Sequence, residues 1–367
     1  MEMNESYPRI VIDLAEEYGY GLQIARGLRR YRVKRPGWIF MRCATELLHH
    51  LEPGSLTGAI GHYFDKAHLQ ALKQNRVPFY VSVSSRGPSD WWPRIIPDNH
   101  AIGRMAAEYF LKKGYRHFGV SDLGKIRFAV ERTEGFRERL AEAGITDLSV
   151  VRVDDPPPDP ARLPMALFAI NDARAHSQIN RFIDHGIRIP EDVSILGVDD
   201  DELVALYSPV PISSVRLPLE QIGFAACELL EAMVNSGKQE YGTYRHAPIG
   251  VIERRSTEAR AVTDGRVRKA LAYMEAHLAT LEGIDSLADA LHLNRRTLER
   301  LFERSIGLSP AALLMQRRAE YAEKLLMETD YTVDHVAELV GFEDRRRLYR
   351  AFKKLGRPLP SLIRAGR

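Results

Sequence analysis

Cysteine, long apolar runs and an excess of one charge are scarce in this sequence, and each shortage excludes a class of protein. The 367 residues include 2 cysteines, Cys43 and Cys227, which are too few for a disulfide scaffold and lack the spacing of metal ligands. No apolar run reaches the ~18–20 residues that span a bilayer, and residues 1–8 do not have the pattern of a signal peptide. We therefore expect a cytoplasmic protein with reduced cysteines, no bound metal and no membrane contact.

Motifs that carry catalysis or hold cofactors are also missing. The chain has no G-x-G-x-x-G after a strand, no phosphate-binding loop, no G-x-S-x-G elbow and no H-E-x-x-H. Its histidines show no partner pattern, so surface or locally satisfied positions are favoured over catalytic ones. Those before residue 200 are His49, His50, His62, His68, His100, His117, His176 and His185. We predict no catalytic residue and no cofactor, and we expect that the protein is not an enzyme.

The formal net charge of +3 is small, but it is unevenly distributed along the chain. From Glu258 to Arg367 there are 20 Lys and Arg against 16 Asp and Glu, a net of +4. Of the 52 basic and 49 acidic residues in all, 32 and 33 remain for the rest of the chain, a net of −1. The basic excess therefore lies in the last third of the chain.

Short apolar runs of β type alternate with longer helical patterns before about residue 255. The predicted strands are 10–12, 79–83, 118–120, 167–170 and 193–198. The predicted helices are 21–31, 102–113, 132–143, 178–185 and 219–234. This alternation predicts parallel sheets with helices on both faces, whereas only helical periodicity follows residue 265. We therefore predict an α/β domain over 1–255, a polar linker over 256–264 and an all-α domain over 265–367.

The last third contains a helix-turn-helix pattern twice, at about 286–305 and 333–354. Asn294 and Asp344 are the predicted N-caps of the two second helices. Ala288 and Ala337 lie 49 residues apart, whereas Arg300 and Arg350 lie 50 apart, so the second turn is one residue longer. A repeat with a single insertion of this kind indicates a duplicated unit.

The second helix of each repeat places arginine on the face opposite its buried leucines. Such a helix can bond phosphates and guanine edges, and two of them one repeat apart can enter successive major grooves of double-stranded DNA. The alternative is a plain helical bundle with solvated arginines. The residues that we expect at DNA are Arg295, Arg296, Thr297, Arg300, Arg345, Arg346, Arg347, Tyr349 and Arg350.

The segments Ser286–Leu326 and Thr332–Arg364 resemble the paired helix-turn-helix domain of AraC-type transcription regulators. The motifs that carry the resemblance are Arg300-Leu-Phe302, Gly307-Leu-Ser-Pro310, Ala337-x-x-Val340-Gly-Phe342 and Tyr349-Arg-Ala-Phe-Lys353. The resemblance implies reading positions at Arg296, Thr297 and Arg300 in the first recognition helix. It implies the same for Arg345, Arg346, Tyr349 and Arg350 in the second.

Polar residues follow several predicted strands of the first domain. They are Asp13, Asn171, Asp172, Asp199 and the pair Asp200-Asp201. In open α/β sheets, ligands bind outside the carboxyl ends of the strands, so we expect a pocket there. Carboxylates and amides suit sugar hydroxyls, which need paired donors and acceptors. The alternative for each residue is a turn or an N-cap, above all for the aspartates before the helix that begins near Glu202.

The same region resembles the effector domain of LacI/GalR-type regulators, a two-lobed periplasmic-binding-protein fold of type I. The motifs include Pro97-Asp98-Asn99, Arg132-x-x-Gly-Phe136, Asn171-Asp-Ala-Arg-Ala175 and Ile195-Leu-Gly-Val-Asp199. The resemblance implies that Arg132, Asn171 and Asp199 bind the sugar. From their positions after predicted strands, we expect Asp13 and Asp172 to bind it as well.

An AraC-like DNA-binding domain (the reader) follows a LacI-like effector domain (the sensor). This domain order is similar to that of the xylose-operon regulator family. Asp199-Asp-Asp-Glu-Leu-Val and Val251-Ile-Glu-Arg-Arg-Ser-Thr257 support the finer match. The resemblance implies a homodimer that answers D-xylose, binds operator DNA and activates sugar-utilisation genes, with RNA polymerase as a further candidate partner. Two alternatives remain open, a regulator with another effector or none, and a cytoplasmic sugar-binding or sugar-modifying enzyme.

Two segments bear on the predicted pocket. The family carries a helix before the Asn171 strand, but residues 154–167 here contain five prolines, which exclude a normal helix. We therefore expect one lobe to lack a helix close to the pocket, which would alter the sugar response. Trp91 and Trp92 either stack on a sugar ring or pack at the lobe interface.

Overall fold

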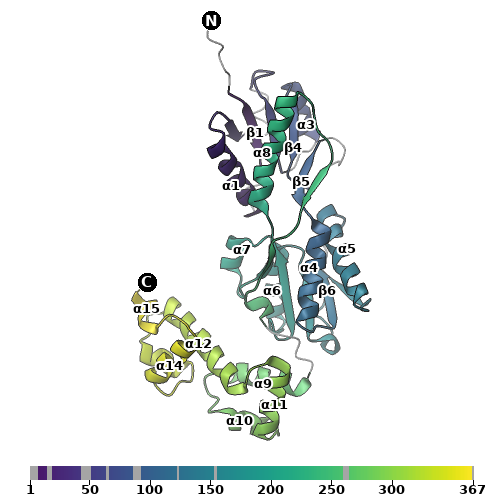
Figure 1. The fold of residues 1–367 in the computed structure, drawn as a ribbon. Coiled ribbons are helices and arrows are strands. Elements are labelled where there is room, and N and C mark those ends of the chain that lie inside the picture. Colours follow the sequence, from purple (N-terminus) through teal and green to yellow (C-terminus); the bar gives the residue numbers. More distant parts are fainter. Residues whose placement is uncertain are drawn as a thin grey trace. The chain divides into compact units, whose positions relative to one another are not determined.

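The computed structural model describes residues 7–14, 19–42, 51–62, 66–85, 92–121, 124–152, 155–258 and 264–365. It divides into two compact units, Met1–Glu258 and Ala259–Arg367, each treated by itself below (Figure 1). Cys43, Trp91 and Asp154 lie outside the described residues, as do His49 and His50. Within the described part, no helix has the length and apolarity needed to cross a membrane.

Lobe 1 of the first unit is built on a sheet in the order β11-β5-β4-β3-β1-β2, with every neighbouring pair parallel. Its strands are β1 (Arg9–Asp13), β2 (Ile39–Arg42), β3 (Gly58–Gly61), β4 (Phe79–Ser82), β5 (Arg94–Pro97) and β11 (Thr243–His246). Its helices are α1 (Gly19–Lys34), α3 (Lys66–Gln74) and α8 (Leu219–Ser236).

Lobe 2 repeats this plan with a sheet in the order β12-β10-β9-β8-β6-β7, parallel except for the β10–β12 pair. The strands are β6 (His117–Ser121), β7 (Leu148–Val151), β8 (Met165–Phe168), β9 (Val193–Val198), β10 (Ser213–Arg216) and β12 (Gly250–Ile252). The helices are α4 (Asn99–Lys112), α5 (Arg127–Glu142), α6 (Asp172–Asp184) and α7 (Glu202–Tyr207), with 3₁₀ turns η1 (Pro160–Arg162) and η2 (Arg255–Thr257).

The chain passes from one lobe to the other between β5 and α4, between β10 and α8, and between β11 and β12 (Figure 1). Each lobe therefore contains segments that are far apart in sequence. Strand–helix alternation had predicted parallel sheets with helices around them, and the two-lobed architecture confirms it.

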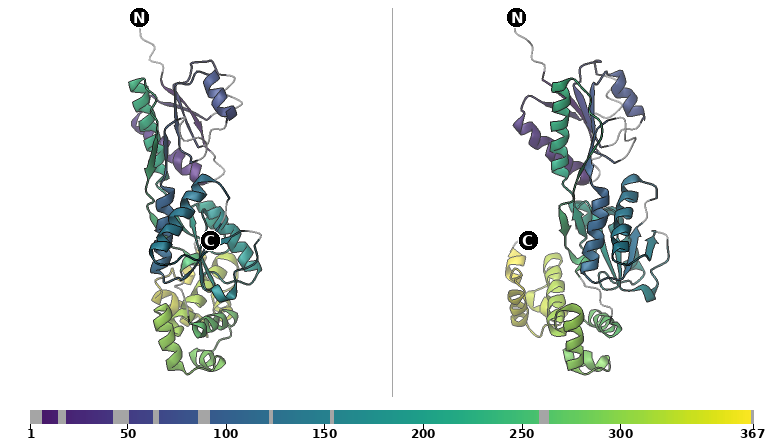
Figure 2. Two further views of the ribbon diagram at one scale, coloured as in Figure 1. Left: turned by 90° about the vertical axis from the view of Figure 1, so that its right-hand side faces the viewer. Right: turned by 45° about the vertical axis from the view of Figure 1, so that its right-hand side comes forward.

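Each lobe contains one pair of helices in very close contact. A Cβ on Gly27 of α1 would lie 2.1 Å from the carbonyl oxygen of Glu220 in α8. A Cβ on Gly103 of α4 would lie 1.9 Å from the carbonyl oxygen of Arg132 in α5. Figure 2 shows α8 beside the sheet of lobe 1 in both views, and α8 contacts β3, β4 and β5. Glycine is required here because backbone meets backbone.

Several element boundaries differ from the sequence prediction. The strand expected at 167–170 is β8, which lies two residues earlier, and α6 begins at Asp172 rather than at 178. The helix expected at 132–143 is α5, which begins at Arg127. The first turn of α6 contains Asp172 and Arg174, so apolar periodicity alone started that helix too late. The strand β3 was missed because its sequence, GAIG, has one β-branched residue, although all four residues are buried.

The segment before β8 has the predicted lack of an α-helix. Among the described residues from 155 to 164, only the 3₁₀ turn η1 is regular, with Asp159 as its N-cap. The Arg181 side chain of α6 donates to the carbonyl oxygen of Pro156 at 2.8 Å. This proline-rich stretch thus packs against α6 in place of a helix.

The first unit continues beyond residue 255. Ser256 and Thr257 are fully buried, and the Ser256 hydroxyl donates to the carbonyl oxygen of Ile195 in β9 at 2.6 Å. These two residues, which the sequence had placed in the linker, therefore belong to lobe 2.

The helical unit has two hydrophobic cores that share α12. Its helices are α9 (Gly265–Ala276), α10 (Ile284–Ala290), α11 (Arg295–Ile306), α12 (Pro310–Glu328), α13 (Val333–Leu339), α14 (Arg345–Lys354) and α15 (Pro360–Ala365). Leu313 and Leu314 of α12 join the core of α9, α10 and α11. Ala322 and Leu326, farther along α12, join the core of α13 and α14.

The two helix-turn-helix units, α10–α11 and α13–α14, have the predicted caps and turns. The side chains of Asn294 and Asp344 each accept the backbone N–H three residues on at 2.7 Å. His292 and Gly341 occupy equivalent turn positions, with φ of 53° and 84°. A Cβ on Gly341 would lie 2.4 Å from the carbonyl oxygen of Ala279, so this turn also fixes the contact between the two halves.

Candidate ligand cavity and nucleic-acid interface

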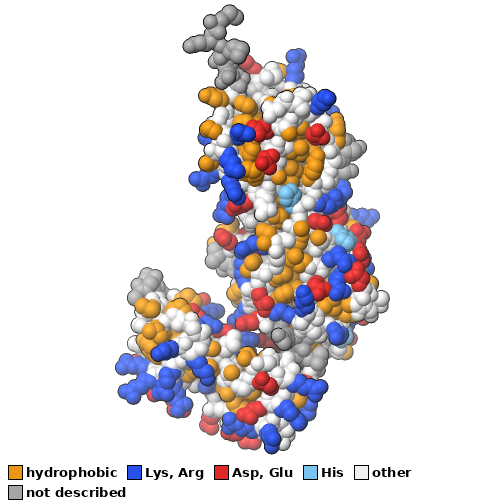
Figure 3. Space-filling view, in the orientation of Figure 1, with side chains coloured by type: hydrophobic (Ala, Val, Ile, Leu, Met, Phe, Trp, Pro, Cys, Tyr) orange, Lys and Arg blue, Asp and Glu red, His pale blue; other side chains and the backbone are white. Residues whose placement is uncertain are grey.

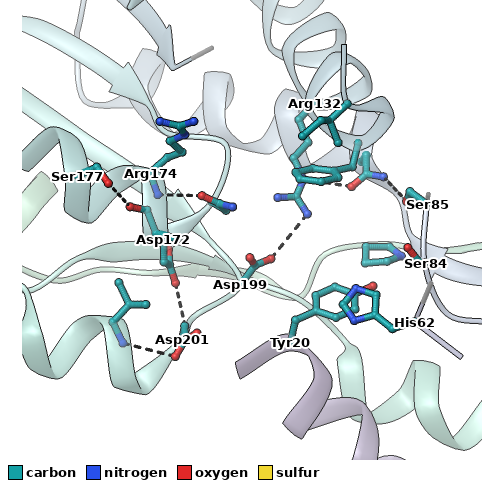
Figure 4. A pocket seen from close by; sticks show the side chains of 17 residues that line it. Tyr20, His62, Ser84, Ser85, Arg132, Asp172, Arg174, Ser177, Asp199 and Asp201 are labelled. Atoms are coloured by element: carbon teal, nitrogen blue, oxygen red, sulfur yellow. Dashed lines mark hydrogen bonds and ion pairs between the residues drawn. The ribbon is translucent and has the colours of Figure 1, made fainter. Parts of the chain in front are cut away.

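A cavity of about 430 Å³ lies between the two lobes of the first unit. Its volume is in the range of small-molecule sites. Lobe 1 supplies Tyr20, His62, Ser84, Ser85 and Pro97. Lobe 2 supplies Asn99, Ile126, Phe128, Arg132, Asn171, Asp172, Ala173, Arg174, Ser177, Asp199, Asp201 and Val204 (Figure 4). The strand ends of both sheets therefore meet at this site, as the position of the polar residues had predicted.

Arg132 is buried at the cavity, with 3% of its surface exposed. Its Nε donates to Asn99 Oδ1 at 3.1 Å and a terminal nitrogen donates to the carbonyl oxygen of Ile170. The guanidinium carbon lies 5.0 Å from the centre of the Phe128 ring. Burial lowers the pKa of Arg132, and Asp199 opposes this shift. Because the close α4–α5 contact occurs at the carbonyl of Arg132, the helix pair fixes where this side chain enters the cavity.

Asp199 faces Arg132 with one oxygen 3.7 Å from a terminal guanidinium nitrogen (Figure 4). That oxygen is buried and accepts no hydrogen bond within the described structure. The φ of Asp199 is 105°, a conformation that favours glycine and is rare for other residues. Burial raises the pKa of Asp199 to about 6, although Arg132 opposes the shift. A strained residue that presents a buried, unpartnered acceptor is the mark of a binding position.

Asn171 and Asp172 lie beside this pair but are partly engaged within the protein. Asn171 is the N-cap of α6, and its Oδ1 accepts the N–H of Arg174 at 2.9 Å. The Asp172 carboxylate accepts the N–H of Asp201 at 2.8 Å and the hydroxyl of Ser214 at 2.7 Å. Burial, followed by the charge of Asp199, raises the pKa of Asp172. The capping alternative is therefore confirmed for Asn171, whose remaining amide still lines the cavity.

The three consecutive aspartates have different partners. Asp201 is the N-cap of α7 and accepts the N–H of Leu203 at 3.0 Å, as the capping alternative had it. Its other oxygen accepts the N–H of Gly19 in α1 at 2.9 Å, which joins lobe 2 to lobe 1. Asp199 and Asp200 do not cap the helix.

Some expected cavity residues lie elsewhere. Asp13 ends β1 but is not one of the lining residues, so a contact with the sugar is not supported for it. Trp92 is buried in the core of lobe 1, 6.2 Å from Tyr80 between ring centres, and does not line the cavity. The described residues 155–164 supply no lining residue either, so the missing helix does not open the pocket directly.

Lobe 1 contributes aromatic residues that the sequence analysis did not select. The rings of Tyr20 and His62 stack with centres 4.8 Å apart and an angle of 26° (Figure 4). The Tyr20 hydroxyl donates to the carbonyl oxygen of Val83 at 3.1 Å. His62 had been interpreted as a surface or locally satisfied residue. The strand-end rule would have selected it, since it directly follows β3, but β3 itself was not recognised.

The predicted DNA-contacting arginines are all exposed on the helical unit. Arg296, Arg300, Arg346 and Arg350 form no ion pair within the described residues. Thr297 and Tyr349 are half-buried beside them. The four arginines occur as i and i+4 pairs on α11 and α14, so each recognition helix presents two free guanidinium groups.

Three other arginines of these helices are already paired. Arg295 lies 3.0 Å from Asp285, Arg345 lies 3.5 Å from Asp334, and Arg347 lies 2.7 Å from Glu343. The first two pairs are equivalent in the two repeats. Figure 3 shows basic side chains gathered over α14, whose sequence, RRRLYRAFKK, contains no acidic residue. This surface can bind a polyanion through phosphates and base edges.

Comparison with known proteins covers both units. A family model for a periplasmic binding protein-like domain matches residues 107–257, and a model for a helix-turn-helix domain matches residues 287–366. The xylose operon regulatory protein of Escherichia coli is 28% identical over 317 residues, 81% of this chain and 81% of that protein. The Haemophilus influenzae protein of the same name is 24% identical over 376 residues, 96% and 97% of the two chains.

A solved structure gives the same result at the level of the whole chain. The structure of the xylose-binding transcription activator XylR matches with a TM-score of 0.72 and 26% sequence identity, and the match covers 99% of each chain.

Among the described residues, no group of three or more His, Cys, Asp and Glu side chains is arranged to hold a metal ion.

Proposed function

Because the chain belongs to the family of xylose operon regulatory proteins and is a sugar-responsive, DNA-binding transcription regulator, we propose that its effector is D-xylose, bound in the cavity between the lobes. The observation that carries the proposal is the buried Asp199 oxygen, 3.7 Å from Arg132, which accepts no hydrogen bond from any residue that the structure describes. A sugar hydroxyl can donate to this oxygen and accept from the guanidinium.

The rest of the cavity suits a small ring with several hydroxyl groups. Asn171 offers its amide from lobe 2, while Ser84 and Ser85 offer hydroxyls from lobe 1. The stacked Tyr20 and His62 rings give an aromatic surface beside these polar groups. A pentose that reaches both sets has polar partners from each lobe and leaves few buried groups unpaired, which a larger apolar ligand would not achieve.

Regulation requires that the sugar bind one arrangement of the lobes more tightly than another. Polar contacts join the lobes directly within the described structure, such as Gly19 to Asp201 at 2.9 Å and Gln23 to the carbonyl oxygen of Asp199 at 3.4 Å. A sugar that bonds to residues of both lobes therefore adds contacts only when the lobes are close together. We propose that it favours the closed arrangement.

We further propose that Arg296 and Arg300 of α11, with Arg346 and Arg350 of α14, bind operator DNA in successive major grooves. A homodimer in the cytoplasm would present two such readers, and activation of sugar-utilisation genes would follow from contact with RNA polymerase at the promoter. The exposure of these four side chains, without ion pairs among the described residues, supports this assignment.

Isothermal titration calorimetry with the full chain against a panel of monosaccharides tests the effector. D-Xylose should bind with one site per chain and be recovered unchanged, while Asp199→Asn should weaken binding by at least tenfold. Glu134→Gln, an exposed carboxylate on α5 outside the cavity, is the matched control and should bind as the wild type does. Absence of heat with every pentose would rule out the proposed effector, and binding of another sugar alone would replace it.

A further inference from the structure

The turn formed by Asp199, Asp200 and Asp201 sends three consecutive carboxylates to three different parts of the first unit. Asp199 faces Arg132 in the cavity, and Asp201 accepts the N–H of Gly19 in lobe 1. Asp200 points to neither. Its carboxylate, 7% exposed, is held by Arg216 and Arg254.

Arg254 belongs to the segment that leads out of the sensor. Its terminal nitrogens donate to Asp200 Oδ1 at 2.6 Å and to the carbonyl oxygen of Ile212 at 2.8 Å. Glu258, four residues later, is the last residue of the first unit. The Asp200–Arg254 pair therefore joins the cavity turn directly to the chain that continues into the DNA-binding unit.

The exit segment, defined here as Glu253–Glu258, is bonded to lobe 2 at several points. Lys113, the C-cap of α4, donates to Glu253 and to the carbonyl oxygen of Thr257, each at 2.6 Å. The Thr257 hydroxyl lies 2.7 Å from the Ser213 hydroxyl at the start of β10, and Ser213 also accepts the N–H of Arg254. A segment held this way follows any displacement of the ends of β9 and β10 and does not absorb it.

The cavity turn is strained and held at each residue. Asp199 and Asp200 have φ of 105° and 54°, a region that L-residues with a Cβ rarely occupy in succession. Their N–H groups donate to the carbonyl oxygen of Val215 at 3.1 Å and to Ser214 Oγ at 2.9 Å. Because the two residues share one planar peptide unit, a change of ψ at Asp199 turns that unit and with it the N–H of Asp200.

We propose that the Asp200–Arg254 ion pair is the coupling element through which occupation of the cavity at Asp199 reaches the DNA-binding unit. This inference rests on the proposed function. A sugar that donates to Asp199 shifts the strained turn, Asp200 moves with it, and Arg254 carries the displacement into the exit segment. Arg254 and Asp200 are positioning residues, since neither is among the residues that line the cavity.

Arg216 supplies a matched control because it holds the same carboxylate from β10, with Nε 2.7 Å from Asp200 Oδ2, and is not part of the exit segment. Arg254→Gln and Arg216→Gln each remove one arginine from Asp200. Only the first should remove the link between the cavity turn and the exit segment, which stays bonded to lobe 2 through its other contacts. Arg254→Lys keeps the charge and should keep the response. Arg254→Met also removes the ion pair and is the variant to use if Arg254→Gln fails to fold.

The experiment measures sugar affinity by calorimetry and DNA affinity by fluorescence anisotropy with the full chain, with and without D-xylose. The DNA is a duplex that the wild-type protein selects from a random library. The affinities of Arg254→Gln for sugar, and for DNA in the absence of sugar, should lie within about threefold of wild type. Adding sugar should no longer change its DNA affinity, so the ratio of the affinities with and without sugar should be about one. By thermodynamic reciprocity, DNA should then no longer change the affinity for sugar. Arg216→Gln should keep both effects.

Three outcomes separate this inference from the function on which it rests. A wild-type chain that binds no monosaccharide overturns the proposed function and the coupling with it. If the wild type responds and Arg254→Gln responds equally, the coupling role alone is wrong. Equal loss of the response in Arg254→Gln and Arg216→Gln would show that Asp200 only stabilises the turn, and would also overturn the inference.

Discussion

Arg132 in the sensor cavity and the four free arginines on the recognition helices use the same side chain in opposite environments. Arg132 is 3% exposed and is bonded to Asn99 and to the carbonyl oxygen of Ile170. The recognition arginines lie in solvent without ion pairs among the described residues. Burial makes Arg132 part of a rigid frame that salt screens little, whereas exposure leaves the others adaptable and easily screened. The difference predicts how each responds to mutation, salt and pH.

The largest effect should come from removing the buried arginine. Arg132→Met leaves Asp199 uncompensated and the Asn99 and Ile170 acceptors unsatisfied, so we expect a loss of about 3–5 kcal/mol in unfolding free energy and no detectable sugar binding. Denaturant unfolding and calorimetry measure the two effects. The control is Arg137→Met, since Arg137 is exposed on the same helix. Equal stability of the two variants would show that Arg132 does not stabilise the sensor.

Single changes on the recognition helices should have intermediate effects on DNA binding and none on sugar binding. Arg300→Ala and Arg350→Ala should each weaken binding by about 1–3 kcal/mol if they read bases. A variant that instead loses a phosphate contact should lower the slope of log affinity against log salt by about 0.9. Anisotropy titrations at several salt concentrations distinguish these cases. Unchanged affinity and salt slope in both variants would contradict the placement of the two helices.

The pH dependence of sugar binding should reveal the buried carboxylate of the cavity. Burial raises the pKa of Asp199 to about 6, so the carboxylate that accepts sugar hydroxyls is mostly protonated at pH 5 and mostly ionised at pH 7. Sugar affinity should then fall about tenfold between pH 7 and pH 5. The free energy of unfolding should depend on pH in the opposite direction to sugar affinity. Because the pKa of Asp199 is raised in the folded state, this group stabilises the fold at low pH and loses that contribution as the pH rises through about 6. If sugar affinity depends on pH in the same way in Asp199→Asn as in the wild type, Asp199 is not the titrating group.

The smallest effect should come from the arginines that already have partners. Arg295 and Arg345 pair with Asp285 and Asp334 at equivalent places in the two repeats. Replacing Arg295 with Ala should weaken DNA binding by only about twofold, because exposed pairs contribute little. Asp285→Asn should tighten it by a similar factor, since it frees the guanidinium for a phosphate. If Arg295→Ala lowers DNA affinity as much as Arg300→Ala does, then the Arg295–Asp285 ion pair breaks when the protein binds DNA.

Much of the helical unit could be predicted from the sequence, because its information is local. The caps Asn294 and Asp344, the apolar periodicity and the extra residue in the second turn all lie within short segments, and the structure has each of them. In the sensor, Arg132, Asn171, Asp172 and Asp199 were placed together correctly from strand ends and family resemblance. Asp13 was expected there too, but it does not line the cavity. Its position at the end of β1 identifies the edge of the sheet and does not establish which residues reach the cavity.

The aromatic side of the cavity could not be predicted from the sequence. Tyr20 lies on α1 and His62 follows β3, and only the sheet order brings the two rings together. Trp92, which looked suited to stacking on a sugar, is buried in the lobe 1 core instead. An aromatic residue near a strand end packs well in either environment, and packing density around it decides between them.

The sequence by itself determined the order of the two units, the duplicated reader with its exposed arginines, and the absence of a helix before β8. Each depends on periodicity, capping or proline content within a few residues. Only the tertiary structure decided that Asp201 holds Gly19, 182 positions away, and that Asp200 holds Arg254, 54 positions away. The reason is physical, since three adjacent aspartates are chemically identical until a strained turn and the surrounding strands give each a different partner.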